Sequence, residues 1–167
     1  LSLAGVRLGA KAPIGVYAID TLRVLDLSNT GIEVLGEDGV EEWVVKLRRL
    51  RVCGNRLRGL CNALGNAPLL EELDASSNLL ELDQVTTLPS SLQTLSFSKN
   101  PTLGGIPSVV FRECLKLRRL DVSGVGLRLL PPDIASLHDL RELIADDNPE
   151  LGSLGGVEWE RLESLSL

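Results

Sequence analysis

Aromatic side chains are scarce in this sequence, and methionine is absent. Only 3% of the 167 residues are Phe, Trp or Tyr, whereas 44% are hydrophobic. A chain of this length can bury a sizeable core, and its apolar content argues against a disordered protein. The core must therefore be built from aliphatic side chains, which suits a small unit that is stacked many times.

Residues that carry chemistry are also few. The single histidine, His138, has no neighbouring nucleophile or metal-ligand pattern and is interpreted as a surface residue. The cysteines Cys53, Cys61 and Cys114 are odd in number and form no metal-type pair. Glycine-rich phosphate-binding motifs are absent as well. We therefore expect no enzyme, no cofactor and no metal site.

Positive charge and long apolar runs are lacking too. The net charge is −6 without a basic stripe, so nucleic acid is excluded as a partner. No apolar stretch approaches the roughly 18 residues of a membrane span, so membrane insertion is not expected. Paired cysteine frameworks are typical of small secreted domains. Their absence favours a reducing compartment, and the cytoplasm is the predicted location.

One pattern returns along the chain: Leu, two residues, Leu, one residue, an apolar residue, two residues, often Asn, and then Leu. Clear copies run from Leu47 to Leu57 and from Leu70 to Leu80. Successive copies begin 22 to 25 residues apart, at Leu22, Leu47, Leu70, Leu92, Leu117, Leu140 and Leu162. Both ends of the sequence fall inside a copy.

These copies resemble the leucine-rich repeat superfamily, whose units span roughly 20–29 residues. The resemblance covers residues 1–167 as a single domain of about six full repeats with a partial repeat at each end, interpreted as part of a longer protein. It implies an α/β solenoid, a right-handed horseshoe with a parallel sheet on its concave face. The mixed repeat lengths fit no single subfamily, although an intracellular type is favoured.

The same architecture follows from the spacing. The second and third apolar positions of each copy are two residues apart, so both side chains face inward from a strand. Stacked parallel strands would then form a continuous core, with eight strand positions in all. The returning segments 39–50 and 108–117 show helical spacing, whereas 82–92 and 130–137 contain Pro and predict irregular or 3-10 turns.

An asparagine follows four of the strands: Asn55, Asn78, Asn100 and Asn148. The chain turns inward there, and Asn carries both a donor and an acceptor for backbone groups that lose water. We interpret this asparagine ladder as structural. Thr30 and Val125 interrupt it, as does Val6 at the start of the chain.

The outward side chains of the strands define the predicted binding surface. We call its central part the concave patch: Glu72, Asp74, Ser76, Ser98, Arg119, Asp121, Ser123, Glu142 and Ile144. Opposite charges alternate from strand to strand, so many should neutralise one another. The expected pairs are Arg49 with Glu72, Arg51 with Asp26 or Asp74, and Arg119 with Glu142.

The serines of the patch are open to two interpretations. Their hydroxyls either bind a partner that approaches closely or simply form the polar edge of the strands. Cys53 occupies the same row and is interpreted as a serine equivalent. The rival surface is the convex side, where Trp43 and Trp159 lie, although core packing explains these two rings more simply.

The resemblance implies a non-catalytic protein–protein interaction module that binds a protein partner, with an intracellular adaptor or scaffold as the preferred class. Two alternatives remain open. The chain could be the recognition arm of a larger enzyme, such as a ubiquitin ligase or a phosphatase regulator. It could also be the ectodomain of a cell-surface or immune receptor.

Overall fold

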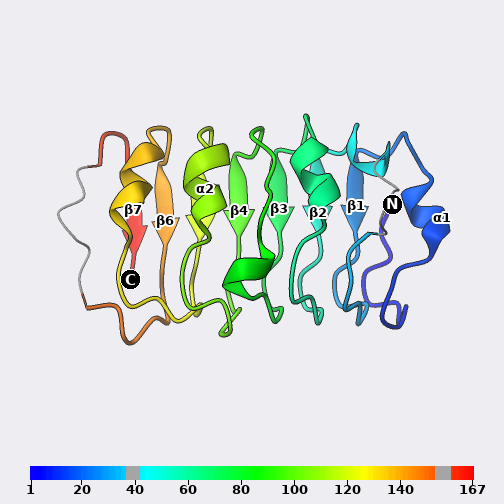
Figure 1. Cartoon of the computed structure of the whole chain (residues 1–167), viewed down its shortest axis with the longest axis horizontal. Coiled ribbons are helices and arrows are strands. Elements are labelled where there is room, and N and C mark those ends of the chain that lie inside the picture. Colours follow the sequence, from blue (N-terminus) through cyan, green and yellow to red (C-terminus); the bar gives the residue numbers. More distant parts are fainter. Residues whose placement is uncertain (37–41, 153–158) are drawn as a thin grey trace.

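A computed structural model describes residues 1–36, 42–152 and 159–167. Within them, seven short strands form one parallel sheet in which each strand pairs with the next along the chain (Figure 1). The strands are β1 (Val24–Asp26), β2 (Arg49–Arg51), β3 (Glu72–Asp74), β4 (Thr94–Ser96), β5 (Arg119–Asp121), β6 (Glu142–Ile144) and β7 (Ser164–Ser166).

The repeat pattern determines the strand register. Residues at the same repeat position pair across the sheet, so Leu50 lies between Leu25 and Leu73. From β1 to β6 the central leucine of each strand is completely buried, whereas its two neighbours are at least partly exposed. The leucines of successive strands therefore form one continuous core beneath the sheet.

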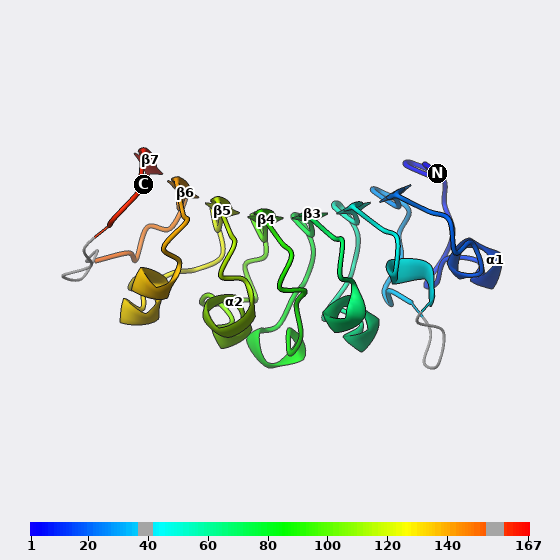
Figure 2. The same cartoon turned by 90° about the horizontal axis from the view of Figure 1, so that it is seen from above.

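The connecting segments lie on the other side of the core (Figure 2). They contain the helices α1 (Ile14–Tyr17) and α2 (Ser108–Glu113) and the 3-10 turns η1 (Glu42–Val44), η2 (Asn62–Asn66), η3 (Leu82–Gln84) and η4 (Pro132–Ser136). The sheet bends away from them, so its free face is concave (Figure 2). The predicted solenoid, with a parallel concave sheet and a mixed convex side, is confirmed.

The return segments are less helical than their spacing predicts. In segment 39–50 the structure describes the turn η1 and the start of β2, and residues 37–41 lie outside the described residues. Helix α2 ends at Glu113 although the predicted helix extends to Leu117. The next strand requires a buried Leu117, and the chain leaves the helix at Cys114 to place it there. The predicted 3-10 turns within 82–92 and 130–137 are confirmed.

The eighth predicted strand position is reduced to a single bridge. Ser2 pairs with Asp26 alone, and Leu3 N–H donates to the Asp26 carbonyl oxygen at 2.8 Å. Gly5, with a φ of +77°, turns the chain at the same repeat position as Asn29, whose φ is +56°. Its N–H donates to the Ser28 carbonyl oxygen at 2.8 Å, so the contact with the next repeat continues beyond the bridge.

Trp43 belongs to the core rather than to the convex surface. Its side chain is fully buried, and its ring lies 5.1 Å from that of Tyr17 at a tilt of 54°. Trp159 is partly buried against the same core. The core interpretation of both rings therefore agrees with the structure.

Candidate protein-binding surface

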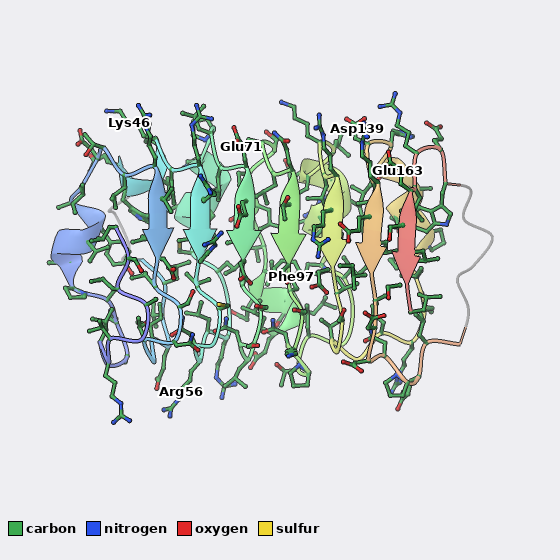
Figure 3. The ribbon with its side chains drawn as sticks, turned by 180° about the vertical axis from the view of Figure 1, so that it is seen from behind. Lys46, Arg56, Glu71, Phe97, Asp139 and Glu163 are labelled. Atoms are coloured by element: carbon green, nitrogen blue, oxygen red, sulfur yellow. The ribbon has the colours of Figure 1, made fainter. Side chains whose placement is uncertain are left out.

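The concave patch lies on one face of the sheet, as its register requires. All of its side chains are partly exposed, and they extend over β3 to β6 and the residues that directly follow these strands. Other charges line the two edges of this face: Glu71 and Glu163 where strands begin, and Arg56 along the opposite edge (Figure 3). These edge residues form ion pairs between neighbouring repeats, such as Arg48–Glu71 at 2.7 Å.

Among the described residues, two ion pairs cross the concave face itself. Arg119 pairs with Glu142 between β5 and β6, as predicted. The other predicted pairs are wrong. Arg51 donates two hydrogen bonds diagonally to Glu72 Oε1, at 3.0 and 3.3 Å, and therefore occupies the carboxylate that Arg49 was expected to meet. Arg49 itself is exposed, and the described residues form no ion pair with it.

The serine hydroxyls are largely used within their own strands. Ser76 Oγ donates to Asp74 Oδ1 at 2.6 Å, and Ser123 Oγ donates to Asp121 Oδ1 at 2.8 Å. The backbone N–H of each serine donates to the same carboxylate oxygen, at 3.1 Å. The hydroxyl protons of Ser76 and Ser123 are therefore engaged already, which favours the polar-edge interpretation for these two serines.

The same arrangement recurs at the start of the sheet. Ser28 N–H donates to Asp26 Oδ1 at 3.0 Å. Burial raises the pKa of Asp26, but hydrogen bonds from Ser28 and the nearby charge of Arg51 outweigh it and leave the pKa below its usual value. This carboxylate is therefore charged at neutral pH.

Each asparagine of the ladder lies beneath the surface, at most 9% exposed. Asn100 is representative. Its amide donates to the carbonyl oxygens of Phe97 at 2.7 Å and Ala75 at 3.1 Å, and its Oδ1 accepts the Leu80 N–H at 3.0 Å. Where Thr30 replaces the asparagine, its hydroxyl donates to the Leu27 carbonyl oxygen at 2.8 Å. These contacts join neighbouring turns, and none of these asparagines is presented to a partner.

The described residues show little that resembles a reactive centre. Burial raises the pKa of the Cys53 thiol, and it raises that of Cys114 to about 12. His138 is exposed, with Nδ1 3.7 Å from Glu160. No group of three potential metal ligands occurs in the described part of the chain, and no helix there is long and apolar enough to cross a membrane.

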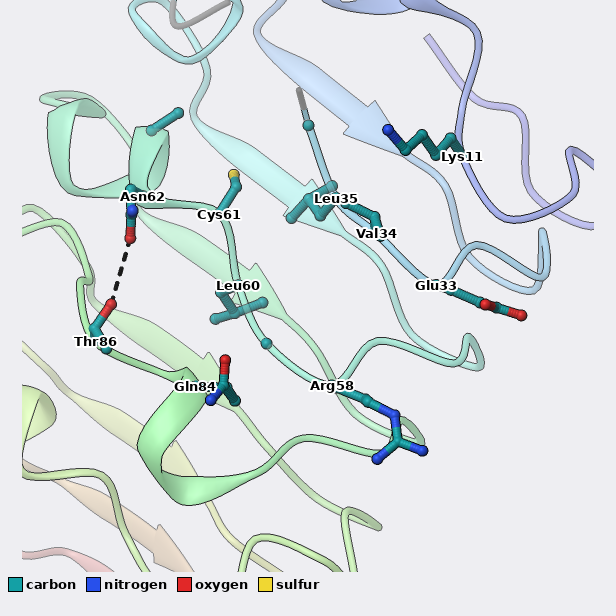
Figure 4. A pocket seen from close by; sticks show the side chains of 13 residues that line it. Lys11, Glu33, Val34, Leu35, Arg58, Leu60, Cys61, Asn62, Gln84 and Thr86 are labelled. Carbon is teal, nitrogen blue, oxygen red and sulfur yellow. Dashed lines mark hydrogen bonds between the residues drawn. The ribbon is translucent and has the colours of Figure 1, made fainter. Parts of the chain in front are cut away.

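A shallow groove of about 690 Å³ lies among the return segments, away from the concave patch. Val34, Leu35 and Leu60 line it together with Lys11 and Arg58 (Figure 4). Asn62 accepts a hydrogen bond from Thr86 at its margin, at 3.3 Å. Sequence reasoning did not find this groove, because the return segments share no repeated pattern that would reveal it.

Two solved leucine-rich repeat structures are similar to this chain in fold. The LRR ectodomain of the plant membrane receptor kinase GASSHO1/SCHENGEN3 from Arabidopsis thaliana, solved in complex with CASPARIAN STRIP INTEGRITY FACTOR 2, is 27% identical and covers 87% of this chain with a TM-score of 0.64. An LRR protein of Leptospira interrogans covers 100% of it at 20% identity and a TM-score of 0.61. The chain belongs to the leucine-rich repeat superfamily.

Among curated proteins, mouse (Mus musculus) Vasorin is 35% identical over 140 residues, or 83% of this leucine-rich repeat chain. No family model matches. The chain spans 20% of Vasorin, 18% of the Arabidopsis ectodomain and 48% of the Leptospira protein.

These relatives include the ectodomain of a plant membrane receptor kinase. They do not support the predicted intracellular type or cytoplasmic location, because an ectodomain lies outside the cell.

Proposed function

We propose that this leucine-rich repeat chain is a non-catalytic recognition module that binds a protein partner on its concave face, over β3 to β6. The observation that carries the proposal is the open sheet itself. Its partly exposed charged and hydroxyl side chains stand on strands that are held by a neighbour on either side. A surface that is rigid before binding loses little conformational freedom when a partner docks.

The complex of the similar Arabidopsis ectodomain with CASPARIAN STRIP INTEGRITY FACTOR 2 supports this class of function. It also favours one of the alternatives drawn from the sequence, a receptor ectodomain, over an intracellular adaptor. A role as the recognition arm of an enzyme has no comparable support. No catalytic role is proposed for this chain, whose histidine is exposed and paired only with Glu160 among the described residues.

A pair of bulky substitutions tests the surface. Ser98→Trp places a large ring at the centre of the concave patch, whereas Asp133→Trp places the same ring on the exposed turn η4 of the convex side. A partner is first selected with the unaltered chain, and its affinity for both variants is then measured by calorimetry.

We expect Ser98→Trp to abolish binding and Asp133→Trp to leave the affinity unchanged. The opposite pattern would place the partner on the convex side and refute the proposal. Circular dichroism of both variants establishes that each retains the fold.

A further inference from the structure

The central strand β4 departs from the charge pattern of the concave face. Its outward residues Thr94 and Ser96, and Ser98 beyond them, are uncharged. Ser96 is in register with Asp74 on β3 and with Asp121 on β5. Neighbouring strands are about 4.8 Å apart, so two aspartates stand one strand away on either side of a short serine. We call this arrangement the β4 notch.

Neither ion pair of the concave face includes a residue of the β4 notch. Arg51 joins Glu72 between β2 and β3, and Arg119 joins Glu142 between β5 and β6. No ion pair among the described residues crosses β4. The charges on the strands to either side of β4 are therefore partly neutralised by ion pairs, whereas no described ion pair neutralises the charges next to β4.

The two aspartates of the notch lack a close cation. Neither Asp74 nor Asp121 has a basic nitrogen within 4.0 Å among the described residues. Arg51 acts on Asp74 only through space, since its guanidinium is bound to Glu72. Lys99, which follows β4 in the sequence, is exposed and forms no ion pair in the described part of the chain.

The hydrogen bonds leave these carboxylates able to accept more donors. Ser76 and Ser123 both bind Oδ1 of their aspartate, and the Cys53 thiol also hydrogen-bonds Asp74. Both aspartates are partly exposed, and a carboxylate has about four acceptor sites. A positive group nearby favours the charged form of a carboxylate, and charged surface residues select partners of opposite charge.

From this charge and shape we infer that the β4 notch holds the lysine or arginine side chain of an extended segment of the protein partner. The inference rests on the proposed function and adds the chemistry of the partner to it. The short hydroxyl side chains of Ser96 and Ser98 let the cation descend between the two carboxylates, which accept its N–H groups from either side. An acidic segment or a nucleic acid would meet repulsion at the same place.

The experiment uses blocked heptapeptides of glycine and serine that differ only in the central residue: arginine, norleucine or glutamate. Each is titrated into the isotope-labelled chain, and binding is followed by NMR shifts of the backbone amides. The same titrations are repeated with the double variant Asp74→Asn and Asp121→Asn. Asparagine keeps the Oδ1 acceptor for the serines and removes the charge.

The matched control is Asp83→Asn with Asp133→Asn, which removes the same charge from the exposed turns η3 and η4. We expect the arginine peptide to shift amides of β3 to β5 and to bind more tightly than the norleucine peptide. Loss of both notch aspartates should weaken it about fivefold or more, while the control variant should retain its affinity. Added salt should weaken the binding.

Three results would each overturn the inference: no saturable binding of the arginine peptide, equal binding of the glutamate peptide, or equal loss in the notch and control variants. The proposed function fails separately. Suppose that Ser98→Trp blocks binding of a natural partner, but that Asp74→Asn with Asp121→Asn leaves the affinity of this partner unchanged. The proposed concave binding site is then supported, and only the inferred cationic contact is wrong.

Discussion

At the scale of single residues, Asn78 holds two neighbouring turns together. Its amide donates to the carbonyl oxygens of Val52, Ala75 and Ser76 at 3.0 to 3.1 Å, and its Oδ1 accepts the Leu57 N–H at 3.0 Å. Asn78→Ala leaves these backbone groups without the amide's hydrogen bonds. We expect the free energy of unfolding to fall by about 1–3 kcal/mol, as measured by urea denaturation.

Asn62 provides the control. It is exposed, and its Oδ1 accepts a single hydrogen bond from Thr86 at 3.3 Å. Asn62→Ala should change the free energy of unfolding by less than about 0.5 kcal/mol. Similar losses in the two variants would show that the ladder contributes nothing special to stability.

The buried asparagines could be predicted because their position after each strand repeats with the leucines. The ion pairs could be predicted only in part. Arg119 meets Glu142 directly across the register, whereas Arg51 reaches Glu72 along a diagonal. Repeat spacing places Cα atoms, but the rotamer of a long side chain decides which of two nearby carboxylates an arginine binds.

At the scale of elements, successive return segments approach each other so closely at Gly59 that a side chain there would collide with the next segment. A Cβ added at Gly59 would lie 2.8 Å from the carbonyl oxygen of Gln84 and 2.9 Å from its Cβ. Gly59→Ala should therefore push the η3 turn outward and lower the free energy of unfolding by about 1–3 kcal/mol. Thermal unfolding followed by circular dichroism measures the effect.

The same substitution elsewhere should be harmless. A Cβ at Gly15, within α1, meets nothing within 4 Å, and alanine favours a helix by up to about 1 kcal/mol over glycine. Gly15→Ala should unfold at the same temperature as the unaltered chain or at a higher one. If Gly59→Ala does so too, the close approach to Gln84 is not a constraint.

The close approach of Gly59 to Gln84 also shows why the secondary structure of the return segments was hard to predict from the sequence. Their spacing reveals which residues face the core, as it does for Trp43 and Leu47, both fully buried. Whether such a segment forms a helix or one 3-10 turn depends on the room left by the neighbouring repeats and on the need to re-enter the next strand. Those limits come from the stack, and a single repeat does not contain them.

At the scale of the whole molecule, stability depends on position in the stack. Leu95 of β4 is fully buried, with β3 and β5 on either side. Leu165 occupies the same repeat position in β7, where it pairs with β6 alone and is 38% exposed. In a solenoid each repeat is stabilised mainly by its immediate neighbours, so the two leucines should contribute unequally although their sequence contexts match.

Leu95→Ala should therefore lower the free energy of unfolding of the 167-residue chain by about 2–5 kcal/mol, the range for a leucine removed from a packed core. Leu165→Ala should cost about 1 kcal/mol, because less apolar surface returns to water and water fills the space that is left. Urea denaturation of both variants makes the comparison. Equal losses would mean that β7 is packed as tightly as the centre of the sheet. A larger loss at Leu95 would show that β4, which carries the β4 notch, is anchored more firmly than the end of the sheet, as a binding surface that is rigid before its partner arrives requires.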